Sequence, residues 1–115
     1  MTGLEFFSGS KALVVKINEE IDHHTCKVLK DKLDVAINLS KIDKLVFDFT
    51  GVNFMDSSGI GMIMGRYKAI KKNSGKVAIT GMQPTVKKII KMSGLYKILE
   101  EYDSLDLALN KLNIV

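Results

Sequence analysis

Short apolar runs alternate with longer segments of helical periodicity along this chain, and that alternation restricts its fold more than any other feature. Residues 12–17 (ALVVKI), 44–49 (KLVFDF) and 76–80 (KVAIT) are rich in β-branched and aromatic residues, which predicts buried strands. A segment of helical spacing follows each of them. Strands that alternate with helices pair in parallel through right-handed crossovers, so we expect an α/β fold.

Two further runs complete the predicted sheet. Residues 4–8 (LEFFS) precede residues 12–17 with only GSK between them, which predicts an antiparallel hairpin. Residues 98–102 (ILEEY) predict a last short strand. We therefore expect an N-terminal hairpin that leads into a mostly parallel sheet of about four or five strands, packed with about four helices. No linker or repeat interrupts residues 1–115, so we expect a single domain.

Each of the first two predicted helices presents one apolar stripe to that sheet. In the helix predicted over residues 22–40, the stripe consists of Cys26, Leu29, Leu33, Ala36 and Ile37. In the helix predicted to begin at Ile60, it consists of Ile60, Ile63, Met64, Tyr67 and Ile70. Asn73–Gly75 is expected to end the second helix, because glycine tolerates a left-handed terminus. Pro84 suits the first turn of a third helix, and Ser104 is expected to cap a fourth that continues to residue 115.

The composition is that of a soluble globular protein, with 46% hydrophobic and 26% charged residues. The formal net charge is +4, but the lysines are scattered and lack interleaved aromatic residues. This distribution argues against direct nucleic-acid binding and favours a solvated face or an acidic protein partner. Cys26 is the single cysteine, so no internal disulfide indicates an oxidising compartment. Because no secretion signal or membrane-spanning apolar stretch is recognisable, we expect a cytoplasmic protein with no membrane role.

The segment FMDSSGIGMIMGRYK is the strongest candidate for a functional site. Its residues Asp56, Ser57 and Ser58 lie where the strand at 44–49, with a predicted extension over 52–55, gives way to a helix. Parallel α/β sheets place their sites at the carboxyl ends of strands. Ser57 or Ser58 is expected to cap the helix through its hydroxyl. Capping alone is therefore one explanation of the motif.

Glycines in the first turns of this helix need a second explanation. Gly59, Gly61 and Gly65 each reduce helix stability by up to about 1 kcal/mol relative to alanine. On a helical wheel Gly61 and Gly65 share one flank, and Met62 and Arg66 point away from the inner stripe. A smooth flank beside an exposed methionine is typical of a docking surface for a partner. Close packing of the helix on its own neighbours explains the glycines equally well.

Enzymatic interpretations fit the sequence less well. The glycines resemble a dinucleotide loop only faintly, and Asp56 would repel the pyrophosphate; no G-x-x-x-x-G-K-[ST] phosphate loop is present. Ser57, with His23 or His24 and with Asp22 or Asp56, supplies the residue types of a hydrolytic triad, but the G-x-S-x-G turn is missing. The two histidines have no cysteine or carboxylate at metal-ligand spacing. We expect a protein that is not an enzyme and has no metal or cofactor.

Phosphorylation is the chemistry that remains for a serine in this position. The free N–H groups and the dipole at a helix N-terminus stabilise an attached phosphate. The modification adds a charge of about −1.5 to −2 next to Asp56. If a partner covers this surface, the phosphate loses water without gaining a counter-ion. A penalty of about 3 kcal/mol changes affinity roughly a hundredfold.

Three blocks of the chain resemble a known family. FMDSSGIGMIMGRYK at 54–68, IDHHT at 21–25 and MSGLYKIL at 92–99 are similar, in this order, to the bacterial anti-sigma factor antagonists of the STAS-domain family, above all to those of spore-forming bacteria. The resemblance runs essentially from end to end. It implies a STAS-type α/β fold and a regulator that binds an anti-sigma factor, itself a serine kinase, and so frees the sigma factor. The implied partner is this kinase in its ATP- or ADP-bound form. The kinase uses ATP to phosphorylate the first serine of DSSG, and a PP2C-type phosphatase reverses the modification.

On this chain the resemblance implies that Ser57 is the phosphoacceptor. It also implies a partner-contact surface made of Asp22, Asp56, Ser57, Ser58, Gly59, Gly61, Met62 and Gly65. One position departs from the family, because Glu19 stands where a glycine is usual. A second interpretation remains open, in which the domain is a nucleotide-binding STAS sensor or part of a larger stress-signalling assembly.

The first helix also carries apolar residues on its outer side. Val28, Val35 and Leu39 lie opposite the core stripe, with Lys32 beside them. We expect a monomer in which these residues are exposed. Weak self-association through this strip is a further hypothesis.

Overall fold

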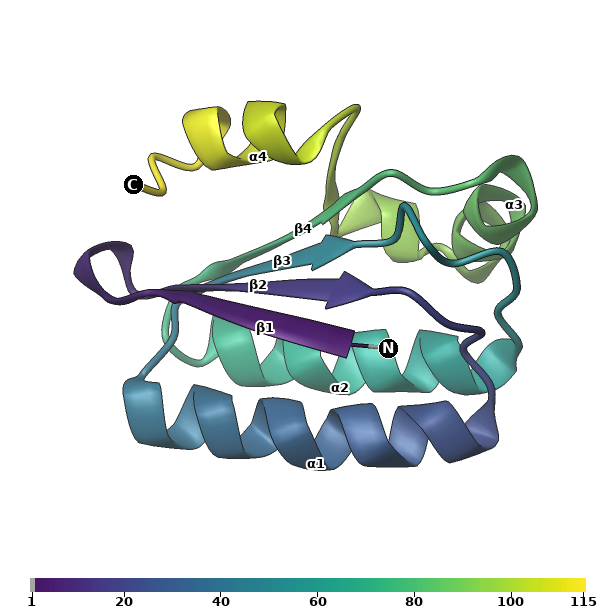
Figure 1. Cartoon of the computed structure of the whole chain (residues 1–115), viewed down its shortest axis with the longest axis horizontal. Coiled ribbons are helices and arrows are strands. Elements are labelled where there is room, and N and C mark those ends of the chain that lie inside the picture. The colour runs from purple at the N-terminus through teal and green to yellow at the C-terminus, as the bar shows by residue number, and fades with distance from the viewer. Residues whose placement is uncertain (1) are drawn as a thin grey trace.

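Five strands form one sheet in the computed structural model, which describes residues 2–115 (Figure 1). In spatial order they are β1 (Thr2–Phe7), β2 (Ala12–Ile17), β3 (Lys44–Asp48), β4 (Lys76–Thr80) and β5 (Glu100–Tyr102). β1 and β2 pair antiparallel, and every later pair is parallel. The expected α/β fold with an N-terminal hairpin is therefore confirmed.

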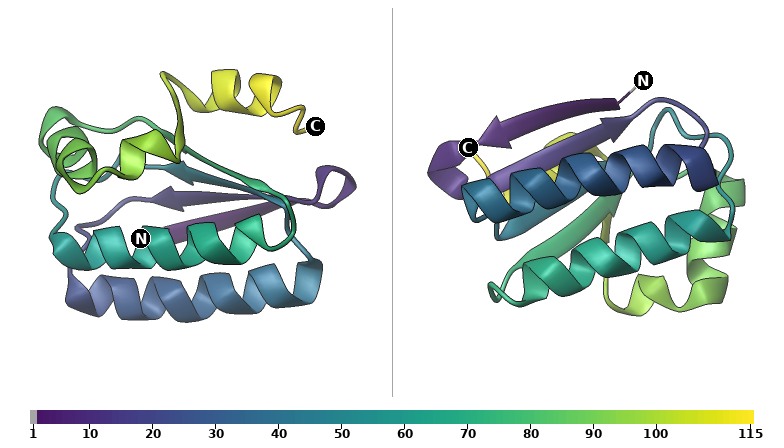
Figure 2. Two further views of the ribbon diagram at one scale, coloured as in Figure 1. Left: turned by 180° about the vertical axis from the view of Figure 1, so that it is seen from behind. Right: turned by 90° about the horizontal axis from the view of Figure 1, so that it is seen from below.

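The helices cover both faces of this sheet. They are α1 (His23–Ser40), α2 (Ser57–Lys71), α3 (Pro84–Ser93) and α4 (Leu105–Lys111), with short 3₁₀ turns at Ser8–Ser10 and Leu95–Lys97. α1 and α2 run side by side beneath the sheet, and α4 lies on the opposite face (Figures 1 and 2). Successive right-handed crossovers that proceed in one direction along a sheet place their helices on the same face. Within residues 2–115, no helix has both the length and the apolar character of a membrane span.

β2 and β3 each contribute side chains to two hydrophobic cores, one on each face of the sheet, because successive side chains of a strand point to opposite faces. Leu13 and Val15 of β2 pack towards α1 and α2, whereas Ala12 and Val14 pack towards α4. Burial on both faces explains why β2 and β3 have nearly continuous apolar sequences. The predicted stripe of α1 is confirmed in full, since all five of its residues are buried.

Two predicted helix starts, at Pro84 and at the Ser104 cap, are also confirmed. Pro84 is the first residue of α3, and Gly94, with φ 83°, ends that helix in the left-handed conformation. The Ser104 side chain accepts a hydrogen bond from the Leu107 amide and so caps α4. α4 nevertheless ends at Lys111 and does not continue to residue 115 as expected, because Asn113 turns the chain with φ 56°.

The predicted strand extension over residues 52–55 is wrong. The Val52 amide bonds back to the Phe49 carbonyl in a tight turn, and only Met55 makes a single bridge, to Ile21. The predicted end of the second helix is confirmed, since α2 stops at Lys71 just before Asn73–Gly75. The expected reason is wrong, because Ser74 and not Gly75 takes the left-handed conformation, with φ 56°. Gly75 is needed for another reason. A Cβ there would overlap the Asp43 carbonyl.

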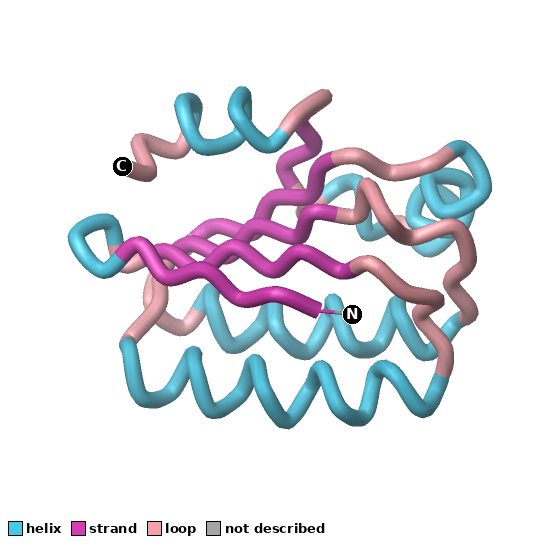
Figure 3. Tube along the Cα trace, viewed as in Figure 1, coloured by secondary structure: helices cyan, strands magenta, loops and turns pink. Residues whose placement is uncertain are grey.

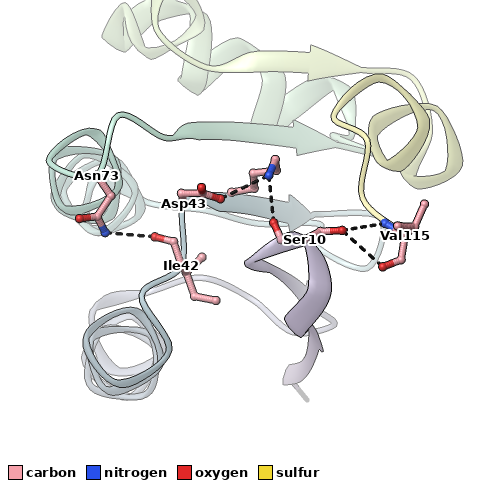
Figure 4. Close-up of polar contacts among 6 residues, drawn as sticks. Ser10, Ile42, Asp43, Asn73 and Val115 are labelled. Atoms are coloured by element: carbon pink, nitrogen blue, oxygen red, sulfur yellow. Dashed lines mark hydrogen bonds and ion pairs between the residues drawn. The ribbon is translucent and has the colours of Figure 1, made fainter.

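Polar contacts fix the amino end of β3 (Figure 4). Lys44 Nζ donates to the Ser10 carbonyl at 2.9 Å, and Asn73 Nδ2 donates to the Ile42 carbonyl at 3.3 Å. Ser10 Oγ accepts from the Val115 amide at 3.0 Å, which holds the end of the chain against the hairpin. The opposite, carboxyl end of the strands carries the loops that lead into α1 and α2 (Figure 3).

Replacement of Gly75 by alanine should lower the free energy of unfolding by about 1–3 kcal/mol, because the new methyl group would overlap the Asp43 carbonyl and the Ile70 side chain. Gly3→Ala in β1 is the control, since a Cβ there meets no atom within 4 Å. Urea denaturation measures both variants. Equal unfolding midpoints would show that the close approach at Gly75 does not constrain the chain.

Candidate functional site

Two helix starts lie side by side at the carboxyl end of the sheet. The Ile21 amide donates to the Phe54 carbonyl at 2.9 Å, and the Asp56 amide donates to the Ile21 carbonyl at 3.0 Å. These bonds form an isolated parallel bridge between Ile21 and Met55. As a result, the IDHHT and DSSG segments meet at one edge of the molecule, although they are distant in sequence.

An aspartate caps each of these helices. Asp22 Oδ1 accepts from the Thr25 amide at 2.8 Å and from Thr25 Oγ1 at 3.0 Å. Asp56 Oδ1 accepts from the Ser58 amide at 2.8 Å. The expectation that Ser57 or Ser58 caps α2 is therefore wrong. A carboxylate is the stronger acceptor, and its charge also suits the positive end of the helix dipole.

Because Asp56 provides the cap, the serine hydroxyls are not needed for it. Ser57 is the first residue of α2 and is exposed, whereas Ser58 is half-buried. The regular helix begins at Ser57 and not at Ile60 as expected, because Asp56 caps it there. An exposed hydroxyl thus stands at the amino end of a helix, directly after the capping Asp56.

The electrostatics of the two caps follow from their hydrogen bonds. The bonds from the backbone and side chain of Thr25 lower the pKa of Asp22. Cys26 lies beneath both caps; burial and the charges of Asp56 and Asp22 raise the pKa of its thiol to about 11. Cys26 is therefore a neutral thiol at physiological pH and a poor nucleophile.

The glycines of α2 divide into two kinds. Gly59 is buried, and a Cβ there would overlap the Met55 side chain and lie 3.2 Å from Cγ2 of Ile21. Close packing on its own neighbours therefore explains Gly59. A Cβ at Gly61 or Gly65 would meet no atom within 4 Å. Internal packing does not explain these two glycines.

Met62 and Arg66 do not point into solvent, contrary to the helical-wheel expectation. They are only 5% and 7% exposed, because α2 is covered by α1 as well as by the sheet. Arg66 Nε lies 3.0 Å from Oδ1 of Asp34 on α1. Of the predicted inner stripe, Ile63 and Ile70 are fully buried, and Ile60, Met64 and Tyr67 are half-buried.

A groove of about 470 Å³ lies between the amino-terminal halves of α1 and α2. On the α2 side it is lined by Ser58, Gly61, Met62, Gly65 and Arg66. The α1 side includes Lys27 and Lys30, which sequence analysis did not select. Their spacing of three residues puts them on one helix face, but only the position of α2 shows that this face borders the groove.

The structure does not assemble the residues of a hydrolytic triad or of a metal site among residues 2–115. Asp22 and Asp56 use Oδ1 to cap helices and do not orient a histidine towards Ser57. Among residues 2–115, no three side chains of histidine, cysteine, aspartate or glutamate are grouped as metal ligands. Glu19, the departure from the family, accepts a hydrogen bond from Thr2 Oγ1 at 3.1 Å and so contacts the first strand.

The outer strip of α1 is exposed as expected. Val28, Val35 and Leu39 are 44%, 58% and 79% accessible to solvent. Self-association through this strip stays a prediction.

Asp56→Ala should lower the free energy of unfolding by about 0.5–2 kcal/mol, the usual loss when a capping side chain is removed. Ser57→Ala should leave it unchanged within about 0.5 kcal/mol, because its side chain is exposed. Urea titrations of both variants provide the comparison. An equal loss in Ser57→Ala would mean that the serine hydroxyl contributes to the cap after all.

Comparison with known proteins agrees with the sequence resemblance. The STAS domain family matches residues 8–108. The anti-sigma F factor antagonist of Paenibacillus polymyxa is 39% identical over 103 residues, which cover 90% of this chain and 88% of that protein.

Solved structures share the fold. The anti-sigma factor antagonist SpoIIAA in its unphosphorylated form has a TM-score of 0.81 and 22% identity, with 100% of both chains covered. The Bacillus cell fate determinant SpoIIAA in the phosphorylated form has a TM-score of 0.79 and 25% identity, with 97% of this chain and 99% of that chain covered. This chain therefore belongs to the STAS-domain family, among its anti-sigma factor antagonists.

Proposed function

We propose that this protein is an anti-sigma factor antagonist switched by phosphorylation of Ser57. The unphosphorylated form binds an anti-sigma factor that is also a serine kinase, and this binding releases the sigma factor. Phosphorylation abolishes binding, and a PP2C-type phosphatase restores it. The observation that carries the proposal is the exposed hydroxyl of Ser57 at the start of α2, which the Asp56 cap leaves available.

The geometry favours Ser57 over Ser58 as the phosphoacceptor. A kinase has to reach the hydroxyl, and Ser57 is exposed whereas Ser58 is half-buried. The Ser58 amide is already bonded to Asp56, which fixes the backbone on which Ser57 is presented. In this proposal Asp22 and Asp56 are part of the contact surface, because the backbone bonds of Ile21 hold the two loops together. Gly59 allows the helix start to pack against Met55 and Ile21.

A phosphate on Ser57 would act through local charge. The helix N-terminus stabilises the anion within the free protein, so the fold does not have to change. In a complex, a charge of about −1.5 to −2 would be desolvated beside Asp56. A penalty of about 3 kcal/mol reduces affinity roughly a hundredfold. The existence of a similar structure in a phosphorylated form supports this interpretation.

The proposed role is binding and not catalysis. The carboxylates beside Ser57 act as helix caps, and the nearby Cys26 is held as a thiol. In this proposal ATP or ADP belongs to the partner kinase. The contact surface extends from the two caps along Gly61, Met62 and Gly65, where Met62 supports the floor beneath the two open glycines.

The test uses the cognate kinase, ATP and two Ser57 variants. Ser57→Ala should bind the kinase as the unmodified protein does and should take up no phosphate. Ser57→Asp should bind at least about tenfold more weakly, since a single negative charge imitates phosphate only in part. Calorimetry measures binding, and intact mass with site mapping measures phosphorylation.

Ser58→Ala is the matched control for the site of modification, and it should still be phosphorylated on Ser57. Full phosphorylation of Ser57→Ala, with the phosphate on Ser58 or a threonine, would show that the acceptor is assigned wrongly.

A further inference from the structure

Arg66 is a buried cation whose hydrogen-bonding capacity is not filled. Its side chain is 9% exposed, and Nε lies 3.0 Å from Asp34 Oδ1 without the alignment of a hydrogen bond. Nη1 is also buried and has no hydrogen-bond partner among the described residues. Buried guanidinium donors are unfavourable unless an acceptor reaches them. Arg66 lines the groove between α1 and α2 and so places its positive charge in the groove wall.

The same groove carries further positive charge. Lys27 and Lys30 of α1 line its edge, and both are exposed. Asp34 pairs with Arg66 but is not itself a lining residue, and no carboxylate belongs to the lining. Met62 contributes an apolar floor. A ligand that suits this groove has a negative group joined to an apolar stem.

The glycines keep the groove open. Gly61 and Gly65 line it, and a Cβ at either position would meet no atom within 4 Å. Each reduces helix propensity relative to alanine, and no internal packing compensates for that loss. Two such glycines, beside an arginine whose hydrogen-bonding capacity is only partly used, are features of a binding groove.

We propose that this groove binds a carboxylate side chain on an acidic segment of the anti-sigma factor kinase, with Lys27 and Lys30 at the rim and Arg66 as the positive charge in the groove wall. The inference rests on the proposed function, because the groove begins at Ser58, next to the phosphoacceptor. At about 470 Å³ it admits a side chain with part of its backbone and not only a small anion. The net charge of +4 also favours an acidic partner.

The proposal adds a second action of the phosphate. Ser57 precedes Ser58 at the mouth of the groove and lies one helical turn before Gly61. A phosphate on Ser57 would therefore repel the incoming carboxylate and compete with it for Lys27 and Lys30. The groove and the switch would then act on the same contact.

Removal of the positive charges of Lys27 and Lys30 tests whether they contribute to kinase binding. The double variant Lys27→Gln/Lys30→Gln should bind the cognate kinase about tenfold more weakly at low salt, with a smaller dependence on salt. Lys72→Gln/Lys111→Gln is the matched control: both lysines are exposed, one at the far end of α2 and one on α4, and the net charge changes equally. Equal affinities of the two double variants would overturn the proposal.

Filling the groove tests its shape. Gly65→Leu places a side chain in open space, so the variant should fold with an unchanged or higher Tm. It should bind the kinase at least about tenfold more weakly. Binding equal to that of the unmodified protein would show that no partner group enters the groove.

A partner-free NMR titration separates this inference from the switch. Hexaglutamate should shift the amide signals of Lys27, Lys30, Gly61 and Gly65 and the Arg66 Nε–H signal, whereas hexaglutamine should not. Equal effects of the two peptides, or equal effects of inorganic phosphate, would overturn the assignment to a carboxylate side chain. If Ser57→Asp binds the kinase normally while the lysine variants weaken binding, the switch fails and the groove stands.

Discussion

The arrangement of the candidate site depends on the hydrogen bond from the Ser58 amide to Asp56 Oδ1. It satisfies the start of α2 with a carboxylate and leaves the Ser57 hydroxyl outside the cap. Asp56 is held in place by its own amide, which bonds to the Ile21 carbonyl beside the first helix start. The site is therefore built on backbone pairing between two loops. None of these hydrogen bonds uses the Ser57 side chain, so we expect a chemical change on Ser57 to leave them in place.

The topology of the sheet brings these loops together. β2 and β3 are adjacent and parallel, so the loops that follow them emerge at the same edge, and both crossovers place their helices beneath the sheet. α1 and α2 then lie parallel with their amino ends level, and the surface between them begins at the two caps. In the proposed function, the partner kinase binds at this edge of the molecule, and a phosphate on Ser57 prevents that binding.

Much of the fold was predictable because local patterns agreed with it. The apolar runs of β2 and β3, the buried stripe of α1 and the position of Pro84 at the start of α3 each follow from residue type and spacing alone. The choice of cap was not predictable in this way: three adjacent side chains can accept the bond, and the distant pairing of Ile21 with Met55 selects Asp56. Likewise, a helical wheel with a single buried side cannot place Arg66, which α1 covers from a second side. The groove between α1 and α2 thus depends on helix–helix packing that the sequence pattern does not encode locally.

The central claim is that one negative charge at the start of α2 makes a close protein contact intolerable. Its most direct measurement compares the affinity of the cognate anti-sigma factor kinase for fully Ser57-phosphorylated and unphosphorylated protein by calorimetry at physiological salt. The account predicts roughly a hundredfold weaker binding of the phosphorylated form with no loss of its folded structure. Equal affinities of the two forms, or weaker binding that arises only because the phosphorylated protein unfolds, would contradict it.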